Sequence, residues 1–240
     1  MTIAIPSHNR STLIVTHALK FVLQELEASP SDVYVFVSTK EMLSEYKQDI
    51  EAPVNIIVTD TYTARDKFNY IHQYFTDGRD VLLIEDDVKG LVTMTDKKPK
   101  RIIQDGFKIM HERGKKIWGV YPSSNKMFMQ MSVLTGFAFI VANIYGYVAD
   151  GDSSVIVTNQ CKTDYERSIL YSINKGGVVR LNYVAPVTKN YTNRGGMQDL
   201  SGRYNLEKTS CENLIKKYPK LVAYKKGTKS KYPEIKLIKQ

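Results

Sequence analysis

The feature that most constrains this chain is an apolar run, residues 81–84, followed at once by Glu85-Asp86-Asp87. Turn-forming residues bound the segment, with Gly78 before the run and Gly90 after the acids. A short apolar run between turns is typical of a buried strand in a parallel sheet. Ligand sites of open α/β sheets lie outside the carboxyl ends of the strands. The pattern therefore predicts a ligand site at the three acids.

These three adjacent carboxylates predict a bound cation. They repel one another and lose hydration at the end of a buried strand, so a positive partner is needed to stabilise them. A hard divalent ion suits carboxylate oxygens and can bind a diphosphate at the same time. The alternative is a solvated acidic turn that caps the next segment.

The rest of the first half alternates strands with amphipathic helices, which predicts right-handed βαβ units in a parallel, doubly wound sheet. After the acids the alternation is less regular, which suggests an acceptor-binding half (96–202) that completes the sheet of a nucleotide-binding half (1–95). The predicted strands are residues 3–5, 33–37, 54–58, 81–84, 116–121, 133–143 and 178–183, and the predicted helices include 13–26, 43–46, 64–75, 102–113 and 164–174.

Charge is the unusual part of the composition. The 240 residues carry a net charge of +9, which favours a polyanionic partner such as nucleic acid, an acidic glycan or a membrane surface. Residues 207–240 hold ten lysines against three glutamates, with tyrosines between them, so we separate 203–240 as a basic C-terminal extension suited to phosphate contacts and base stacking. A solvated lysine-rich tail is the alternative. The candidate DNA contacts are Lys216, Lys217, Lys225, Lys226, Lys229 and Lys231.

Other sequence features set the expected compartment. Cys161 and Cys211 form no CxxC pair, so neither a disulfide framework nor a zinc site is indicated. The chain starts with a predicted strand and not with a signal peptide, so we expect a cytoplasmic protein, in the host cytoplasm if viral. The longest apolar stretch, 133–149, is interrupted and too short to span a bilayer, so no membrane contact is predicted.

Four motifs together resemble the GT-A glycosyltransferases, which use nucleotide sugars. They are residues 5–10 at the first strand end, Asp60 after the third strand, residues 64–67 opening the next helix, and residues 84–87 at the fourth strand end. The resemblance covers roughly residues 1–190. It implies a Rossmann-like mixed sheet flanked by helices, a UDP-sugar donor, and Mn²⁺ or Mg²⁺ on the diphosphate.

The resemblance also implies residue roles on the donor side. Asp87 is implied as the main metal ligand, with Asp86 as a second one. Asp60 is implied to recognise the base, and Arg65 to reach the base or the phosphates. The residues implied to line the nucleotide site are Pro6, Ser7, Asn9, Arg10, Glu85 and Asp86.

An inverting transfer needs a base that takes the proton of the acceptor hydroxyl. Asp164 matches the acid that opens the helix after the acceptor loop in similar enzymes, and Glu166, two residues later, points to another helix face. The alternative for Asp164 is an acid that balances the helix dipole. By the same resemblance, Gly136 is placed where the backbone approaches the sugar.

A second informative stretch is the loop at residues 188–198. Two glycines after an arginine make a loop whose backbone amides and cations could bind phosphates, and many GT-A enzymes close such a loop over the donor. A surface hairpin is the alternative. Metal-dependent relatives often place a histidine here, whereas this chain has none after His111. The candidate residues for the donor sugar or diphosphate are Lys189, Asn190, Arg194, Gly195 and Gly196.

Size, charge and motif order look most like the DNA-modifying glycosyltransferases of phages and of the base J pathway. That resemblance implies transfer of a sugar, expected to be glucose, to the hydroxymethyl group of a modified pyrimidine in double-stranded DNA. Three alternatives stay open. One is a cytosolic glycosyltransferase for a glycan, lipid or protein acceptor. Another is a nucleotidyltransferase, although residues 6–10 lack the glycines it would need. The last is a non-catalytic DNA-binding protein, which would leave the acids without a purpose.

Overall fold

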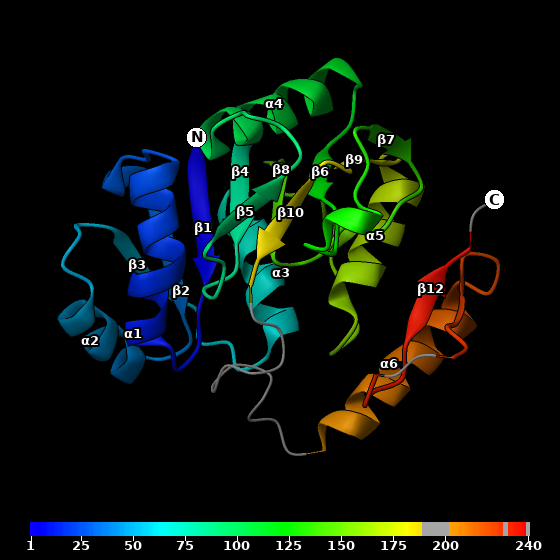
Figure 1. Cartoon of the computed structure of the whole chain (residues 1–240). Helices are drawn as coiled ribbons and strands as arrows, with labels where there is room; N and C mark the ends of the chain where they lie inside the picture. The colour runs from blue at the N-terminus through cyan, green and yellow to red at the C-terminus, as the bar shows by residue number, and fades with distance from the viewer. Residues whose placement is uncertain (189–201, 228–229, 239–240) are drawn as a thin grey trace.

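The computed structural model describes residues 1–188, 202–227 and 230–238. Its centre is an eight-stranded mixed sheet in the order β3-β2-β1-β4-β8-β6-β9-β7, with helices on both faces (Figure 1). Its strands are β1 Thr2–Pro6, β2 Val33–Val37, β3 Asn55–Val58, β4 Arg79–Ile84, β6 Ile117–Val120, β7 Val133–Gly136, β8 Ile144–Ala149 and β9 Val178–Leu181.

The first half has the predicted parallel βαβ arrangement. Strands β3, β2, β1 and β4 pair in parallel. Alternate side chains of β1 face opposite layers, since Ile3 and Ile5 join one apolar cluster and Ala4 joins the other. Both faces are therefore covered, as the continuous apolar strands require.

The helices divide between these two layers. The helix labelled α1 begins at Ser11–Ile14 and continues with π-type hydrogen bonds through η1 (Val15–Leu19) and η2 (Phe21–Glu25). It shares one layer with α2 (Lys40–Asp49) and α4 (Pro99–Glu112). The other layer contains α3 (Ala64–Tyr74) and α5 (Thr163–Asn174).

The second half differs from the prediction first at a central strand. The strand predicted at 133–143 begins where expected but ends at Gly136 as the edge strand β7, and the buried strand is β8, which lies antiparallel between β4 and β6. Glycine is required inside β8: a Cβ at Gly146 would lie 2.1 Å from the Trp118 indole nitrogen. The ring of Trp118 thus packs directly on the strand.

The predicted strand at 178–183 is confirmed as β9, which ends at Leu181, and a second strand that was not predicted follows it. A turn at residues 182–183 separates β9 from β10 (Val184–Val187), which pairs with β5 (Gly90–Thr93) in a separate two-stranded sheet. This pairing, which no sequence pattern predicted, joins the segment just after the acids to the acceptor half.

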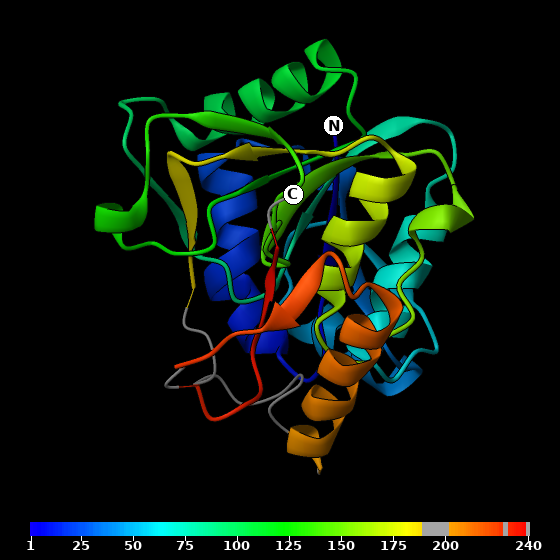
Figure 2. The same ribbon diagram turned by 90° about the vertical axis from the view of Figure 1, so that its right-hand side faces the viewer.

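The described part of the basic extension packs against α5 (Figure 2). It consists of α6 (Arg203–Lys217) and the antiparallel pair β11 (Val222–Tyr224) and β12 (Ile235–Leu237). Lys162 lies just before α5, and its ammonium pairs with Glu207 at 3.1 Å and Glu234 at 3.6 Å. The extension is therefore anchored to the helix that carries Asp164. The apolar residues buried at this contact are Ile169, Cys211, Leu214, Val222 and Ile235.

Among the described residues, every helix is too short or too polar to cross a lipid bilayer.

Candidate active site

One edge of the sheet gathers most of the predicted site. The carboxyl ends of β1, β2, β3 and β4 meet there because these strands are parallel. Helices α3 and α5 begin at the same edge, at the bottom of Figure 1. The first loop, the three acids and the start of α5 are therefore neighbours, although they are up to about 160 residues apart in the sequence.

Asp86 joins the first loop to the fourth strand. Its Oδ1 lies 2.7 Å from the Arg10 guanidinium, and its Oδ2 accepts a hydrogen bond of 2.6 Å from the Ser7 hydroxyl. Tyr46 extends the network, because its hydroxyl lies 2.6 Å from Ser7 Oγ and accepts the Arg10 backbone amide. Each Asp86 oxygen accepts one of these bonds and keeps a second lone pair, so its predicted role as a second metal ligand stays a prediction.

Arg10→Ala is expected to lower the free energy of unfolding by roughly 3–5 kcal/mol, because it leaves the buried Asp86 carboxylate without its ion-pair partner. Urea unfolding measures this loss. Arg79→Ala is the comparison variant, since Arg79 pairs with Asp77 on the surface and lies over the Phe75 ring, so its loss should cost much less than the loss of the Arg10 pair. Equal losses for the two variants would show that the Arg10 pair is no more than a surface contact.

Glu85 and Asp87 supply the remaining carboxylates of the acidic cluster. Glu85 Oε2 accepts a hydrogen bond of 2.6 Å from the Asn143 amide, and Asp87 is buried. Burial, with the negative charges of Asp87, Asp86 and Asp164, raises the pKa of Glu85 to about 8. A divalent cation would relieve this repulsion.

The donor set fits a metal that a substrate completes. No group of three His, Cys, Asp or Glu side chains in the described parts of the chain is arranged to hold an ion alone. Mg²⁺ is commonly bound by one or two carboxylates together with substrate phosphates. The hard oxygens of Asp87 and Glu85 suit that type of site.

Lys67 also lies at this edge, although the sequence predicted no role for it. Its ammonium is buried and donates a hydrogen bond of 2.5 Å to the Ser7 carbonyl, so Lys67 stabilises the loop that follows β1. Burial lowers its pKa to about 8, partly opposed by Asp86. The available signal was its position: Lys67 falls on the otherwise apolar stripe of α3 that contains Phe68 and Ile71.

Asp164 lies in the first turn of α5, close enough to Glu85 for its charge to raise the Glu85 pKa. Burial raises the pKa of Asp164 itself, while the positive charges of Arg167 and Lys162 oppose this. Glu166 has a different task. It is fully buried, and its carboxylate accepts hydrogen bonds from Thr158 and Asn159 and pairs with Lys217.

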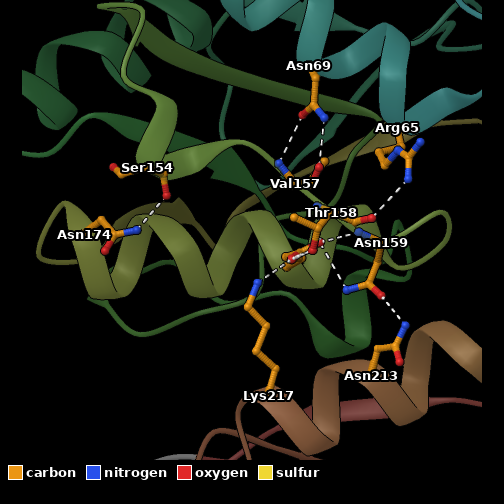
Figure 3. A network of polar contacts seen from close by, with 10 residues as sticks. Arg65, Asn69, Ser154, Val157, Thr158, Asn159, Asn174, Asn213 and Lys217 are labelled. Carbon is orange, nitrogen blue, oxygen red and sulfur yellow. Dashed lines mark hydrogen bonds and ion pairs between the residues drawn. The ribbon is translucent and has the colours of Figure 1, made fainter.

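The loop before α5 is fastened from three sides (Figure 3). The Asn69 amide exchanges two hydrogen bonds with the Val157 backbone, at 2.8 and 3.1 Å. Arg65 donates to the Thr158 carbonyl at 3.2 Å and pairs with Asp66. From α6, Asn213 reaches Asn159 at 3.4 Å. Arg65 is therefore tied to this loop in the structure, and its contact with a nucleotide stays a prediction.

Three other predicted donor residues lie at the same edge. Pro6 ends β1, and the exposed Asn9 follows with φ 53°, a left-handed conformation that asparagine tolerates. Asp60 is exposed just after β3, also left-handed at φ 51°. Their contacts with a nucleotide stay predictions.

Gly136 is not at this edge, which corrects its predicted place beside the sugar. Strand β7 runs antiparallel to β9, and Gly136 pairs with Val178 at the start of β9. Since β9 is parallel to β6, which runs in the direction of β4, Gly136 lies at the opposite edge from the acids. Its backbone cannot approach a sugar bound there.

The structure describes most of the lysines predicted to bind DNA, whereas several other predicted residues fall outside the described part of the chain. Lys217 lies over the Tyr218 ring besides pairing with Glu166, and Lys231 lies over the Tyr232 ring. The side chains of Lys216, Lys225 and Lys226 are exposed. The predicted residues outside the described ranges are Lys189, Asn190, Arg194, Gly195, Gly196 and Lys229.

This chain resembles known proteins in its structure and not detectably in its sequence. The sequence matches no protein-family model and no curated protein sequence. The mannosyltransferase PcManGT from Pyrobaculum calidifontis, solved with GDP-Man and Mn²⁺, superposes with a TM-score of 0.57 at 11% identity, over 91% of this chain and 63% of that one. The fold is a GT-A fold.

Two further GT-A structures agree. S. aureus TarS in complex with UDP-GlcNAc gives a TM-score of 0.53 at 11% identity and covers 89% of this chain and 66% of its own. M. tuberculosis glucosyl-3-phosphoglycerate synthase gives a TM-score of 0.53 at 9% identity, and the match covers 97% of this chain and 86% of that one. The chain thus spans just under two thirds of the TarS and PcManGT chains. At these identities the likeness establishes the GT-A fold, and the residues must carry the functional argument.

Proposed function

We propose that this chain is a metal-dependent glycosyltransferase that moves a sugar, glucose, from a UDP-sugar to the hydroxymethyl group of a modified pyrimidine in DNA. The observation that carries the transferase proposal is the meeting of Ser7, Arg10, the acidic cluster and Asp164 at the carboxyl edge of a GT-A fold. Two structures of that fold bind nucleotide sugars, UDP-GlcNAc in TarS and GDP-Man in PcManGT.

The donor side requires positive charge where the diphosphate leaves. Asp86 holds Arg10 at the site through an ion pair, and Lys67 stabilises the loop after β1 through its hydrogen bond to the Ser7 carbonyl. Asp87 and Glu85 would hold a divalent cation, which when bound supplies further positive charge for the leaving diphosphate. Ser7 and Asn9 then border the nucleotide as parts of the loop that follows β1.

The acceptor side requires a group that takes a proton. The hydroxymethyl oxygen attacks the anomeric carbon, the bond from that carbon to the diphosphate oxygen breaks, and the electron pair leaves with UDP. The hydroxyl proton passes to the Asp164 carboxylate. Asp164 suits this role because it is ionisable, lies beside Glu85 and starts a helix whose preceding loop is fixed by Asn69 and Arg65.

The DNA acceptor is supported by charge. The net charge is +9, and the exposed Lys216, Lys225 and Lys226 lie on an extension anchored to the helix of Asp164. Lysines placed in this way can bind a phosphate backbone and release its counterions.

Replacing Lys225 and Lys226 together by glutamine should weaken binding to duplex DNA and reduce the slope of log affinity against log salt by roughly 1 for each lysine that contacts a phosphate. Fluorescence anisotropy over a salt series measures both quantities. Lys47→Gln is the matched control, because Lys47 is exposed on α2, away from the extension. A slope that falls equally in both variants would remove the extension from the DNA contact.

A panel of nucleotide sugars with Mn²⁺ tests the proposed function. We expect UDP release from UDP-glucose, stimulated by hydroxymethylated DNA and not by plain DNA. Stimulation by a glycan, lipid or protein instead would keep the glycosyltransferase and reject the DNA acceptor. Release of pyrophosphate from nucleoside triphosphates would favour a nucleotidyltransferase.

A further inference from the structure

The loop after β6 exposes three large apolar side chains to solvent. Met127 and Phe128 lie on the turn η4 (Lys126–Phe128) and are 86% and 60% exposed, and Met131 follows three residues after that turn and is 63% exposed. We call these three side chains the apolar tip. Full burial of such a side chain is worth roughly 1.5–3 kcal/mol, so a cluster left in water marks a contact surface.

The apolar tip is held by hydrogen bonds from its own loop. The Asn125 side chain accepts the Met127 amide at 3.0 Å, and the Phe128 amide donates to the Asn125 carbonyl at 3.0 Å. Met129 is buried between the exposed residues, and the Gln130 amide donates to the Asn182 carbonyl at 3.1 Å. The tip is thus presented in a defined conformation, which reduces the entropy lost when a partner binds.

The loop of the tip leaves the sheet at the edge where the acids lie. Strands β4 and β6 both pair antiparallel with β8, so they run in the same direction and their carboxyl ends share one edge. The loop then projects from the acceptor half, as the short green turn at the left of Figure 2. A partner on the tip would therefore extend along the acceptor side of the site.

Basic residues lie beside the apolar tip. Met94 donates its amide to the Tyr183 carbonyl at 3.0 Å, next to the Asn182 carbonyl that anchors Gln130. Residues 96–101 follow Met94 and contain four cations and one acid. Lys98 and Lys126 are exposed, while Lys97 and Arg101 share Asp105 and Lys100 pairs with Glu27. An apolar tip that begins with the exposed Lys126, on the same half as the exposed Lys98, suits a partner that combines stacked apolar faces with negative charge.

We propose that the apolar tip inserts between base pairs of duplex DNA beside the modified pyrimidine and unstacks it, while the neighbouring lysines contact the phosphates. This inference rests on the proposed function. A base inside a duplex must leave the stack before an enzyme can act on it, and Phe and Met wedges unstack base steps in other DNA-binding proteins. An anionic membrane is the alternative partner for the same apolar and basic side chains, and vesicle binding is the outcome of the test below that would reject the DNA wedge.

Phe128→Ala tests the wedge, with Ile173→Ala as the matched control because Ile173 is also exposed but lies at the far end of α5. We expect kcat/KM for a hydroxymethylated duplex to fall roughly 10- to 100-fold in Phe128→Ala, with little change for the single strand. A mismatch opposite the modified base should restore most of the rate, since it makes unstacking easier. UDP release without acceptor should be unchanged.

A second measurement needs no sugar transfer. A 2-aminopurine placed beside the modified base should brighten when the wild-type protein binds, and not when Phe128→Ala binds. An unchanged duplex rate, an equal loss on single strands, or equal brightening by both proteins would overturn the proposal. If Phe128→Ala instead keeps the duplex rate and loses binding to anionic vesicles, the apolar tip is a membrane contact. If the wild-type protein transfers no sugar to DNA, the proposed function fails, and the 2-aminopurine signal still decides the wedge.

Discussion

Asp87→Asn is expected to abolish metal-dependent sugar transfer while the fold stays intact. The amide keeps the size of the side chain but removes the negative charge that would hold the cation, and the leaving diphosphate then loses several kcal/mol of stabilisation. We expect kcat to fall roughly 10³-fold or more. The measurement is UDP release from UDP-glucose across a Mn²⁺ titration, with circular dichroism as the check on folding.

The control for Asp87→Asn is Asp96→Asn, because Asp96 is exposed after β5 and outside the acidic cluster. In the wild-type protein and in this control, Mn²⁺ with UDP should raise the melting temperature, since a ligand that binds only the folded state stabilises it. Asp87→Asn should lose that rise. Undiminished turnover in Asp87→Asn would remove this residue from the metal site.

Asp164→Asn is expected to keep donor binding and lose transfer. An asparagine amide cannot take the hydroxyl proton, and loss of a general base typically costs 10²- to 10⁴-fold in rate. Isothermal titration with UDP should give nearly the same affinity as in the wild-type protein. If donor binding and transfer disappear together, the assignment of Asp164 as the base is wrong.

The same residue sets the expected pH dependence. The base must be deprotonated, so transfer should fall as the pH drops through the pKa of Asp164. Burial raises that pKa, so the acid limb should lie above the ordinary range for an aspartate. In Asp164→Asn the residual transfer rate should no longer fall as the pH drops through this range.

The first half of the fold was predictable because sequence and burial agree there. Each strand is a short apolar run and each helix has one apolar stripe, so the alternation alone indicates a parallel sheet. The meeting of Ser7, Arg10 and Asp86 then follows from topology, since parallel strands bring their carboxyl ends to one edge.

The second half was harder because residues 133–149 are almost continuously apolar. Periodicity cannot show which part of such a run pairs with β4, so β8 was missed and with it Asn143, which lies opposite Glu85. Gly136 was misplaced because a sequence does not give the direction of a strand. The antiparallel β7 carries Gly136 to the wrong edge.

The packing of the basic extension was hidden by its composition. Its buried residues, such as Leu214, Val222 and Ile235, are few and scattered among lysines, and they are buried only because α5 supplies the other side of the contact. Lys67 was overlooked as a site residue for a related reason. Its partner is a backbone carbonyl, that of Ser7, and only the fold brings the two together.

The most direct test of the central claim is the mass of a DNA duplex after incubation with the protein, UDP-glucose and Mn²⁺. One duplex carries a single hydroxymethylated pyrimidine, and the other is identical except for the plain base. The account predicts that the modified duplex gains one hexose, that the plain duplex gains none, and that Asp87→Asn and Asp164→Asn eliminate the gain. The account would be contradicted if the mass of the hydroxymethylated duplex did not change while the protein transferred glucose from UDP-glucose to another acceptor.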